Sequence, residues 1–151
     1  DALEGLRAVE AVMRDLAKQI ARDGEGATKL LTVNVTSAPS EADALKAART
    51  VASSSLLKSA VYGNDPNWGR ILAALGRSDV TFQPTQTSVS VQGIAVFDGQ
   101  PLEFDKEAAS SAMRSEEVVI DVDLGAGSAS GTAWGCDLTE QYVRINAEYT
   151  T

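Results

Sequence analysis

The period of the hydrophobic pattern changes along the chain, and this change most constrains the fold. Residues 3–20 place apolar side chains at steps of three and four, with charged residues between them, as one face of a helix requires. Residues 29–36 then alternate apolar and polar side chains, which predicts a strand. A chain with both periods packs helices against a sheet. The sequence therefore predicts an α+β fold with layered helices and a mixed or antiparallel sheet.

Capping and turn signals divide the rest of the chain into short elements. A capping box of Ser40 and Asp43 predicts a helix over residues 41–53, and Asn67 predicts the N-cap of a helix that Gly76 ends. The apolar segment 56–62 between them fits either a helix or a strand. The later elements are predicted as strands over 87–92 and 94–97, a helix over 105–113, a strand pair over 118–124 and 128–134 joined through 125–127, and a final helix over 138–147.

The chain has neither an internal repeat nor a long linker, so residues 1–151 are predicted to form a single α+β unit. Two closely packed lobes that divide near residues 77–86 are the alternative. The sequence leaves this choice open.

The charge balance and the apolar runs exclude several classes of protein. A net charge of −8 repels phosphate backbones, so nucleic acid is not an expected partner. No apolar run approaches the ~20 residues of a membrane helix, and no signal-peptide pattern is visible at the N-terminus. The single cysteine excludes an internal disulfide and suits a reducing compartment. We therefore expect a cytoplasmic protein without a membrane partner.

The absence of histidine limits the chemistry. Ser–His and Cys–His dyads and His-containing zinc sites are excluded, so any nucleophile needs another base. Cys136 has no histidine partner and is predicted to be a small buried hydrophobe. Asp121 and Asp123 lie two apart on a predicted strand and hence on one face, where a solvated sheet surface explains them better than a carboxylate dyad.

The glycine-rich segment 23–29 admits two interpretations. A phosphate loop is excluded, because that loop lies between a strand and a helix, whereas this one follows a helix and precedes a strand. The first interpretation is a helix C-cap formed by Gly24 and Gly26. The second is a tight turn on which the Glu25 carboxylate receives an ammonium group.

The segment 64–70 resembles part of a calcium loop, but no glutamate follows at the twelfth position. We therefore predict no metal site. The structural interpretation is a turn fixed by Pro66, in which Asn67 caps the next helix, Trp68 packs into the core and Arg70 pairs with a carboxylate.

Taken together, these motifs resemble a known family. The segments Arg-Asp-Gly-Glu-Gly-Ala-Thr-Lys at 22–29, Asp-Pro-Asn-Trp-Gly-Arg-Ile-Leu-Ala-Ala at 65–74, Asp-Leu-Thr at 137–139 and Tyr-Val-Arg-Ile-Asn-Ala-Glu-Tyr at 142–149 occur in the family's order. The chain resembles the bifunctional glutamate N-acetyltransferase/ornithine acetyltransferase of arginine biosynthesis, over essentially all of its length.

The resemblance implies a self-processing acetyltransferase with an N-terminal threonine nucleophile. In that family the precursor cleaves itself into an α chain and a β chain, and the threonine carries acetyl from N-acetylornithine to glutamate. The present chain resembles the C-terminal part of a β chain, so the nucleophile is expected upstream of Asp1 and no catalytic residue is expected within 1–151. The implied partners are the α chain, the substrates and further αβ units. No cofactor is implied, with acetyl-CoA as an alternative acetyl donor, and the isolated fragment is expected to be inactive.

The resemblance also assigns substrate contacts to Glu25, Asn146 and Thr151. Glu25 would receive an ammonium group, and Asn146 has an amide that both donates and accepts. Two other functions remain open at this point: a stand-alone amino-acid binding or interaction module, and an aminopeptidase-like relative that also uses an N-terminal nucleophile.

Overall fold

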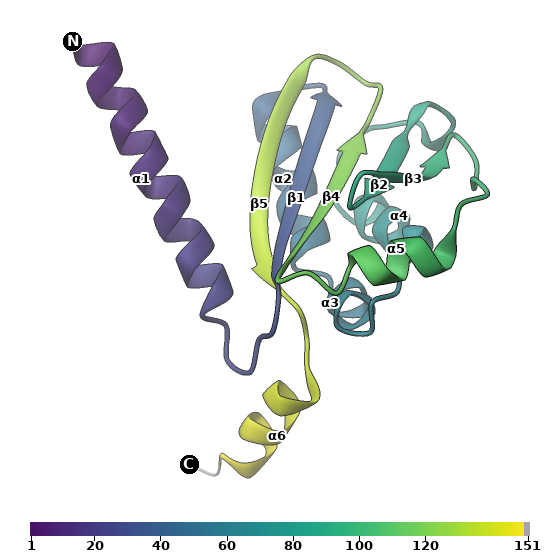
Figure 1. Cartoon of the computed structure of the whole chain (residues 1–151). Helices are drawn as coiled ribbons and strands as arrows, with labels where there is room; N and C mark the ends of the chain where they lie inside the picture. The colour runs from purple at the N-terminus through teal and green to yellow at the C-terminus, as the bar shows by residue number, and fades with distance from the viewer. Residues whose placement is uncertain (150–151) are drawn as a thin grey trace.

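The computed structural model describes residues 1–149, which form six α-helices, one short 3-10 helix and five strands (Figure 1). The helices are α1 (Ala2–Arg22), α2 (Glu41–Ala52), α3 (Ser55–Tyr62), α4 (Trp68–Gly76), α5 (Lys106–Ala112) and α6 (Glu140–Glu148), with the 3-10 helix at Pro84–Gln86. The strands are β1 (Leu30–Ala38), β2 (Ser88–Val91), β3 (Ile94–Asp98), β4 (Glu117–Asp123) and β5 (Ala129–Cys136). The predicted α+β class is confirmed.

The five strands form one mixed sheet in the order β3-β2-β4-β1-β5. β1 pairs with β4 in parallel and with β5 antiparallel, whereas β2 is antiparallel to both β3 and β4. β1 precedes residues 77–86 in the sequence and the other four strands follow them, so strands from both parts of the chain belong to one sheet. β1 and β4 are central strands, and their inward side chains form much of the core.

The predicted pairing of residues 118–124 with 128–134 is wrong, because β1 lies between β4 and β5. The connection between the two strands crosses the end of β1, where Ala126 N–H donates to Ser37 O at 2.8 Å. A Cβ at Gly127 would lie 2.3 Å from Ala38 O, so only glycine lets the connection pass this close. The glycine turn permits the crossing over β1 and does not form a hairpin.

The local capping signals placed the helices correctly. Ser40 accepts from Asp43 N–H at 3.1 Å and begins α2. Asn67 accepts from Arg70 N–H at 3.0 Å and begins α4. The segment whose type was open is helix α3, because Ser54 accepts from Leu57 N–H at 3.3 Å and acts as its N-cap. α2 packs against β1 and β5, and it lies behind the sheet in Figure 1.

α1 is the predicted amphipathic helix, but every one of its residues is exposed or half-buried. It extends beside β5 and away from the sheet (Figure 1). Its apolar side chains are 47–76% exposed; they are Leu3, Leu6, Val9, Val12, Met13, Leu16 and Ile20. We call these seven side chains the α1 stripe. No helix within residues 1–149 is both long enough and apolar enough to cross a membrane.

Candidate substrate site

Glu25 and Asn146 are in direct contact, although 121 residues separate them in the sequence. Asn146 Nδ2 donates to Glu25 Oε2 at 3.2 Å and to Tyr142 O, one turn earlier in α6, at 2.8 Å. Both side chains are exposed. Their contact places a carboxylate and an amide side by side on the surface, where the loop after α1 meets α6.

The loop that carries Glu25 is shaped by close packing. α1 ends at Arg22 with Asp23 as its C-cap, so the predicted end of the helix at this segment is confirmed. Gly24, the residue after the cap, does not have the left-handed backbone of a glycine C-cap, so that part of the prediction is wrong. A Cβ at Gly26, which has φ +69°, would lie 2.7 Å from Tyr142 N. A Cβ at Gly24 would lie 2.5 Å from Cys136 Sγ. The glycines on either side of Glu25 therefore let the loop approach α6 and the end of β5.

Thr151, the third predicted contact, lies outside the described residues. Its role stays a prediction.

Two buried polar residues, which the sequence analysis gave only as part of the Asp-Leu-Thr motif without a role, hold the loop in place. Asp137 is 3% exposed and accepts from Thr28 N–H at 2.8 Å, from Lys29 N–H at 2.9 Å and from the Thr28 hydroxyl. Thr139 is 4% exposed, and its hydroxyl donates to Gly26 O at 2.6 Å. We call residues 24–29 together with residues 137–139 the junction.

Lys29 links the junction to the next loop. Its ammonium donates to Val61 O at 2.8 Å and to Asn64 Oδ1. Burial lowers the pKa of Lys29, because removing water disfavours the charged form, and the positive charge of Arg114 lowers it further. The negative charge of Asp137 opposes this effect and raises the pKa. Lys29 thus ties the junction to the end of α3 and the loop that follows it.

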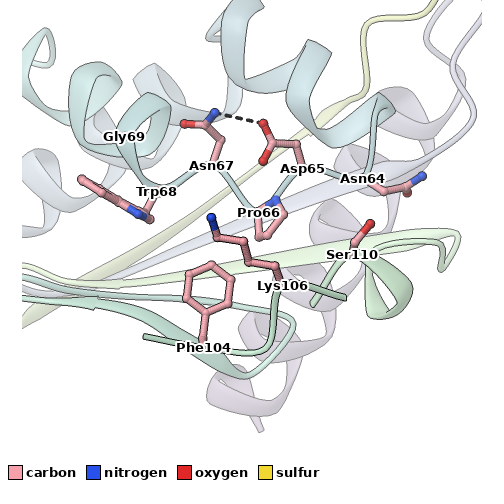
Figure 2. Close-up of a pocket in the computed structure, with 9 residues that line it drawn as sticks. All are labelled: Asn64, Asp65, Pro66, Asn67, Trp68, Gly69, Phe104, Lys106 and Ser110. Atoms are coloured by element: carbon pink, nitrogen blue, oxygen red, sulfur yellow. Dashed lines mark hydrogen bonds between the residues drawn. The ribbon is translucent and has the colours of Figure 1, made fainter. Parts of the chain in front are cut away.

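A separate pocket of about 480 Å³ lies beside the segment 64–69 (Figure 2). Phe104, Lys106 and Ser110 form its other wall, and neither Glu25 nor Asn146 lines it. Within it Asn67 Nδ2 donates to Asp65 Oδ2 at 2.9 Å, the contact drawn in Figure 2.

The residues of this segment serve the packing of α4. Trp68 is half-buried against the core, and its ring stacks on Phe97 with centroids 5.5 Å apart. The predicted ion pair of Arg70 with a carboxylate is wrong. Its guanidinium donates to the backbone carbonyl of Leu56 at 2.8 Å and so ties α4 to α3.

The sequence profile of the ArgJ family matches residues 2–151. The chain belongs to the ArgJ family. The resemblance to the acetyltransferases of arginine biosynthesis is thereby confirmed, and an aminopeptidase-like relative is disfavoured.

Curated relatives and a solved structure agree with this assignment. The chain is 62% identical to the arginine biosynthesis bifunctional protein ArgJ of Deinococcus radiodurans, over 100% of this chain and 39% of that relative. It is 50% identical to the glutamate N-acetyltransferase of Methanopyrus kandleri, over 96% of this chain and 38% of that relative. The crystal structure of ArgJ from Bacillus halodurans matches with a TM-score of 0.94 and 42% identity, covering 97% of this chain and 70% of that one. The chain therefore spans less than half the length of these curated relatives.

The other candidate residues of this ArgJ chain make contacts that the packing of the sheet and its loops explains. Asp121 and Asp123 are exposed, and they accept from Asn34 Nδ2 and Gly125 N–H, each at 2.9 Å, as expected of a solvated sheet face. Cys136 is half-buried rather than fully buried, because it lies at the end of β5 next to Gly24. Among residues 1–149 no three His, Cys, Asp or Glu side chains are grouped to hold a metal ion.

The chemistry available at the Glu25–Asn146 contact is recognition of a small polar ligand. A carboxylate attracts an ammonium group, and an amide both donates and accepts hydrogen bonds. Both groups are also exposed to a ligand approaching from solvent.

Proposed function

We propose that this chain supplies part of the substrate site of an enzyme that transfers acetyl from N-acetylornithine to glutamate. The contact between Glu25 and Asn146 carries the proposal, since these are two of the residues that the family resemblance assigns to substrate. Both belong to motifs of an ArgJ-family chain. Amino-acid substrates present ammonium and carboxylate groups, which this pair of side chains is suited to bind.

The proposed reaction has two steps. In the first, a threonine hydroxyl outside residues 1–151 attacks the acetyl carbonyl of N-acetylornithine. The amide C–N bond breaks, the released amine takes the hydroxyl proton, and the acetyl group remains as a threonine ester. In the second, the amine of glutamate attacks this ester, the C–O bond breaks, and the proton returns to threonine. An N-terminal amine can serve as the base for its own hydroxyl, which suits a chain without histidine.

Within this scheme Glu25 binds the substrate ammonium group. Its Oε2 accepts a hydrogen bond from Asn146, which favours one direction of the carboxylate before a ligand arrives. A carboxylate that is already oriented loses less side-chain entropy on binding. Asn146 is in turn fixed on α6 by its bond to Tyr142 O.

The exposure of the α1 stripe indicates that another polypeptide covers it. Seven large apolar side chains that remain 47–76% exposed form the kind of surface that marks an interaction site. Because the chain spans 39% of the Deinococcus relative, we propose that the remainder of the polypeptide, including the α chain, covers this stripe. Assembly into further αβ units, independence of a cofactor, the use of acetyl-CoA as an alternative donor and a cytoplasmic location stay predictions.

An assay of ornithine release from N-acetylornithine plus glutamate tests the proposal. The full-length protein that contains these residues is expected to release ornithine, whereas the chain 1–151 alone is expected to release none. Turnover by the isolated chain would show that a nucleophile lies within it. Absence of turnover by the full-length protein would leave amino-acid binding, measured by calorimetry, as the alternative function.

A further inference from the structure

The segment between β5 and α6 contacts both elements that carry the candidate substrate residues. Asp137 holds Thr28 and Lys29, which follow Glu25 by three and four positions. Thr139 holds the carbonyl of Gly26, the residue directly after Glu25. The loop is therefore bound to one short segment at both its middle and its end.

The same segment also begins the helix that carries Asn146. Thr139 is the N-cap of α6, and its hydroxyl oxygen accepts from Tyr142 N–H at 3.1 Å. The carbonyl of Tyr142 accepts from Asn146 Nδ2. One threonine hydroxyl thus joins the two sides: it donates to the Glu25 loop and accepts from the first turn of the Asn146 helix.

The Glu25–Asn146 contact cannot hold this arrangement by itself. Both side chains are exposed, and a hydrogen bond at the surface gains little over bonds to water while it costs side-chain entropy. The junction is different, because a carboxylate that is 3% exposed receives three hydrogen bonds there. Hydrogen bonds to a charged, water-excluded acceptor are the strong ones, and losing them leaves donors unsatisfied.

We propose that Asp137 and Thr139 are positioning residues of the substrate site. They fix the loop of Glu25 against the start of α6, so that the carboxylate and the Asn146 amide face the substrate in one geometry. This inference rests on the proposed function, because it needs Glu25 to bind substrate. Neither residue touches substrate itself, and both act through the residues that they hold.

The test uses variants of the full-length protein and measures kcat, KM for each substrate, and melting temperature. Asp137→Ala removes every acceptor, and Asp137→Asn keeps one oxygen in case the alanine variant does not fold. Thr139→Val removes the hydroxyl at nearly constant shape, while Thr139→Ser restores it. The matched control is Asp121→Asn, at an exposed carboxylate on β4 that accepts a side-chain hydrogen bond from Asn34.

If Asp137 and Thr139 position the substrate site, variants at these residues should change KM. Asp137→Asn and Thr139→Val should raise KM for N-acetylornithine about ten- to hundredfold, since misplacing a binding group by about 1 Å costs this much. Thr139→Ser should recover KM to within about threefold, and Asp121→Asn should leave it unchanged. A purely structural role would lower the melting temperature and the amount of active enzyme while KM stayed constant, and this result would overturn the inference.

Glu25→Gln separates this inference from the proposed function. If Asp137 acts through Glu25, the double variant Asp137→Asn/Glu25→Gln should lose little more kcat/KM than the worse single variant. Losses that multiply would overturn the inference. If Glu25→Gln raises KM but the junction variants do not, the inference alone fails. If Glu25→Gln leaves KM unchanged, the proposed substrate site fails and the inference falls with it.

Discussion

α1 and the junction reverse the usual distribution of side chains. The α1 stripe leaves large apolar residues exposed, whereas the junction buries a carboxylate and a threonine hydroxyl. The difference lies in where the partners are. Asp137 and Thr139 find their hydrogen-bond partners in residues 26–29 of this chain. The α1 stripe has the period of a packed helix face, and the partner proposed for it above is the remainder of the polypeptide.

The largest expected effect compares truncation in the two regions of the chain 1–151. Asp137→Ala should lower the free energy of unfolding by about 2–4 kcal/mol, because it removes the buried carboxylate that accepts from the amides of Thr28 and Lys29. Leu6→Ala, at a side chain that is 67% exposed, should change it by less than about 0.5 kcal/mol. Urea unfolding measures both values.

A large decrease in the free energy of unfolding for Leu6→Ala would contradict this contrast between the two regions. It would mean that the α1 stripe is already buried in solution, and a concentration-dependent melting temperature would identify association between copies as the cause. A small cost at both positions would show that the junction hydrogen bonds exchange readily with water.

Trp68→Ala tests a side chain whose burial is intermediate between the two regions. Trp68 packs on the core and stacks on Phe97, so its truncation should cost about 2–4 kcal/mol, somewhat less than for a fully buried tryptophan. Because the residue lines a pocket apart from Glu25 and Asn146, KM of the full-length enzyme should not change. A Trp68→Ala protein with an unchanged melting temperature and a raised KM would move this segment from packing to binding.

The same contrast between local and distant partners explains what the sequence could predict. Ser40 and Asn67 cap helices through amide groups three residues away, so a local pattern was sufficient. The strand pair 118–124 with 128–134 was predicted wrongly because β1, which separates the two strands, lies about eighty residues earlier in the chain.

At the candidate site, the sequence likewise did not predict which groups the side chains would contact. Arg70 was expected to pair with a carboxylate and instead donates to a backbone carbonyl, which no sequence pattern encodes. Asp137 bonds to amides 108 and 109 residues away, so the Asp-Leu-Thr motif marked its position but could not show its partners. Glu25 and Asn146 were selected by resemblance to a family, and their proximity is a finding of the structure.

Glu25→Gln in the full-length enzyme tests whether the carboxylate beside the junction binds substrate. It keeps the shape of the side chain and removes the charge that the substrate ammonium group needs. KM for N-acetylornithine should rise about ten- to hundredfold, the range for a hydrogen bond to a charged group. Glu148→Gln, at an exposed carboxylate on the same helix as Asn146, is the matched control and should leave KM unchanged. Equal kinetics for both variants would remove Glu25 from the site.

The smallest expected effect concerns Lys29, the lysine of the junction. Lysine has an ordinary pKa of 10.5, and burial lowers the pKa of Lys29 below this value in the folded chain. Between the two pKa values the unfolded chain therefore binds more protons than the folded chain. The contribution of Lys29 to stability should therefore rise with pH through this window and level off above it. Urea unfolding of the wild type and of Lys29→Met from pH 7 to 11 measures this contribution as the difference between the two curves. If the Lys29 difference instead fell as the pH rose, the Asp137 charge would outweigh burial at the junction, and Lys29 would be held there as an ion pair.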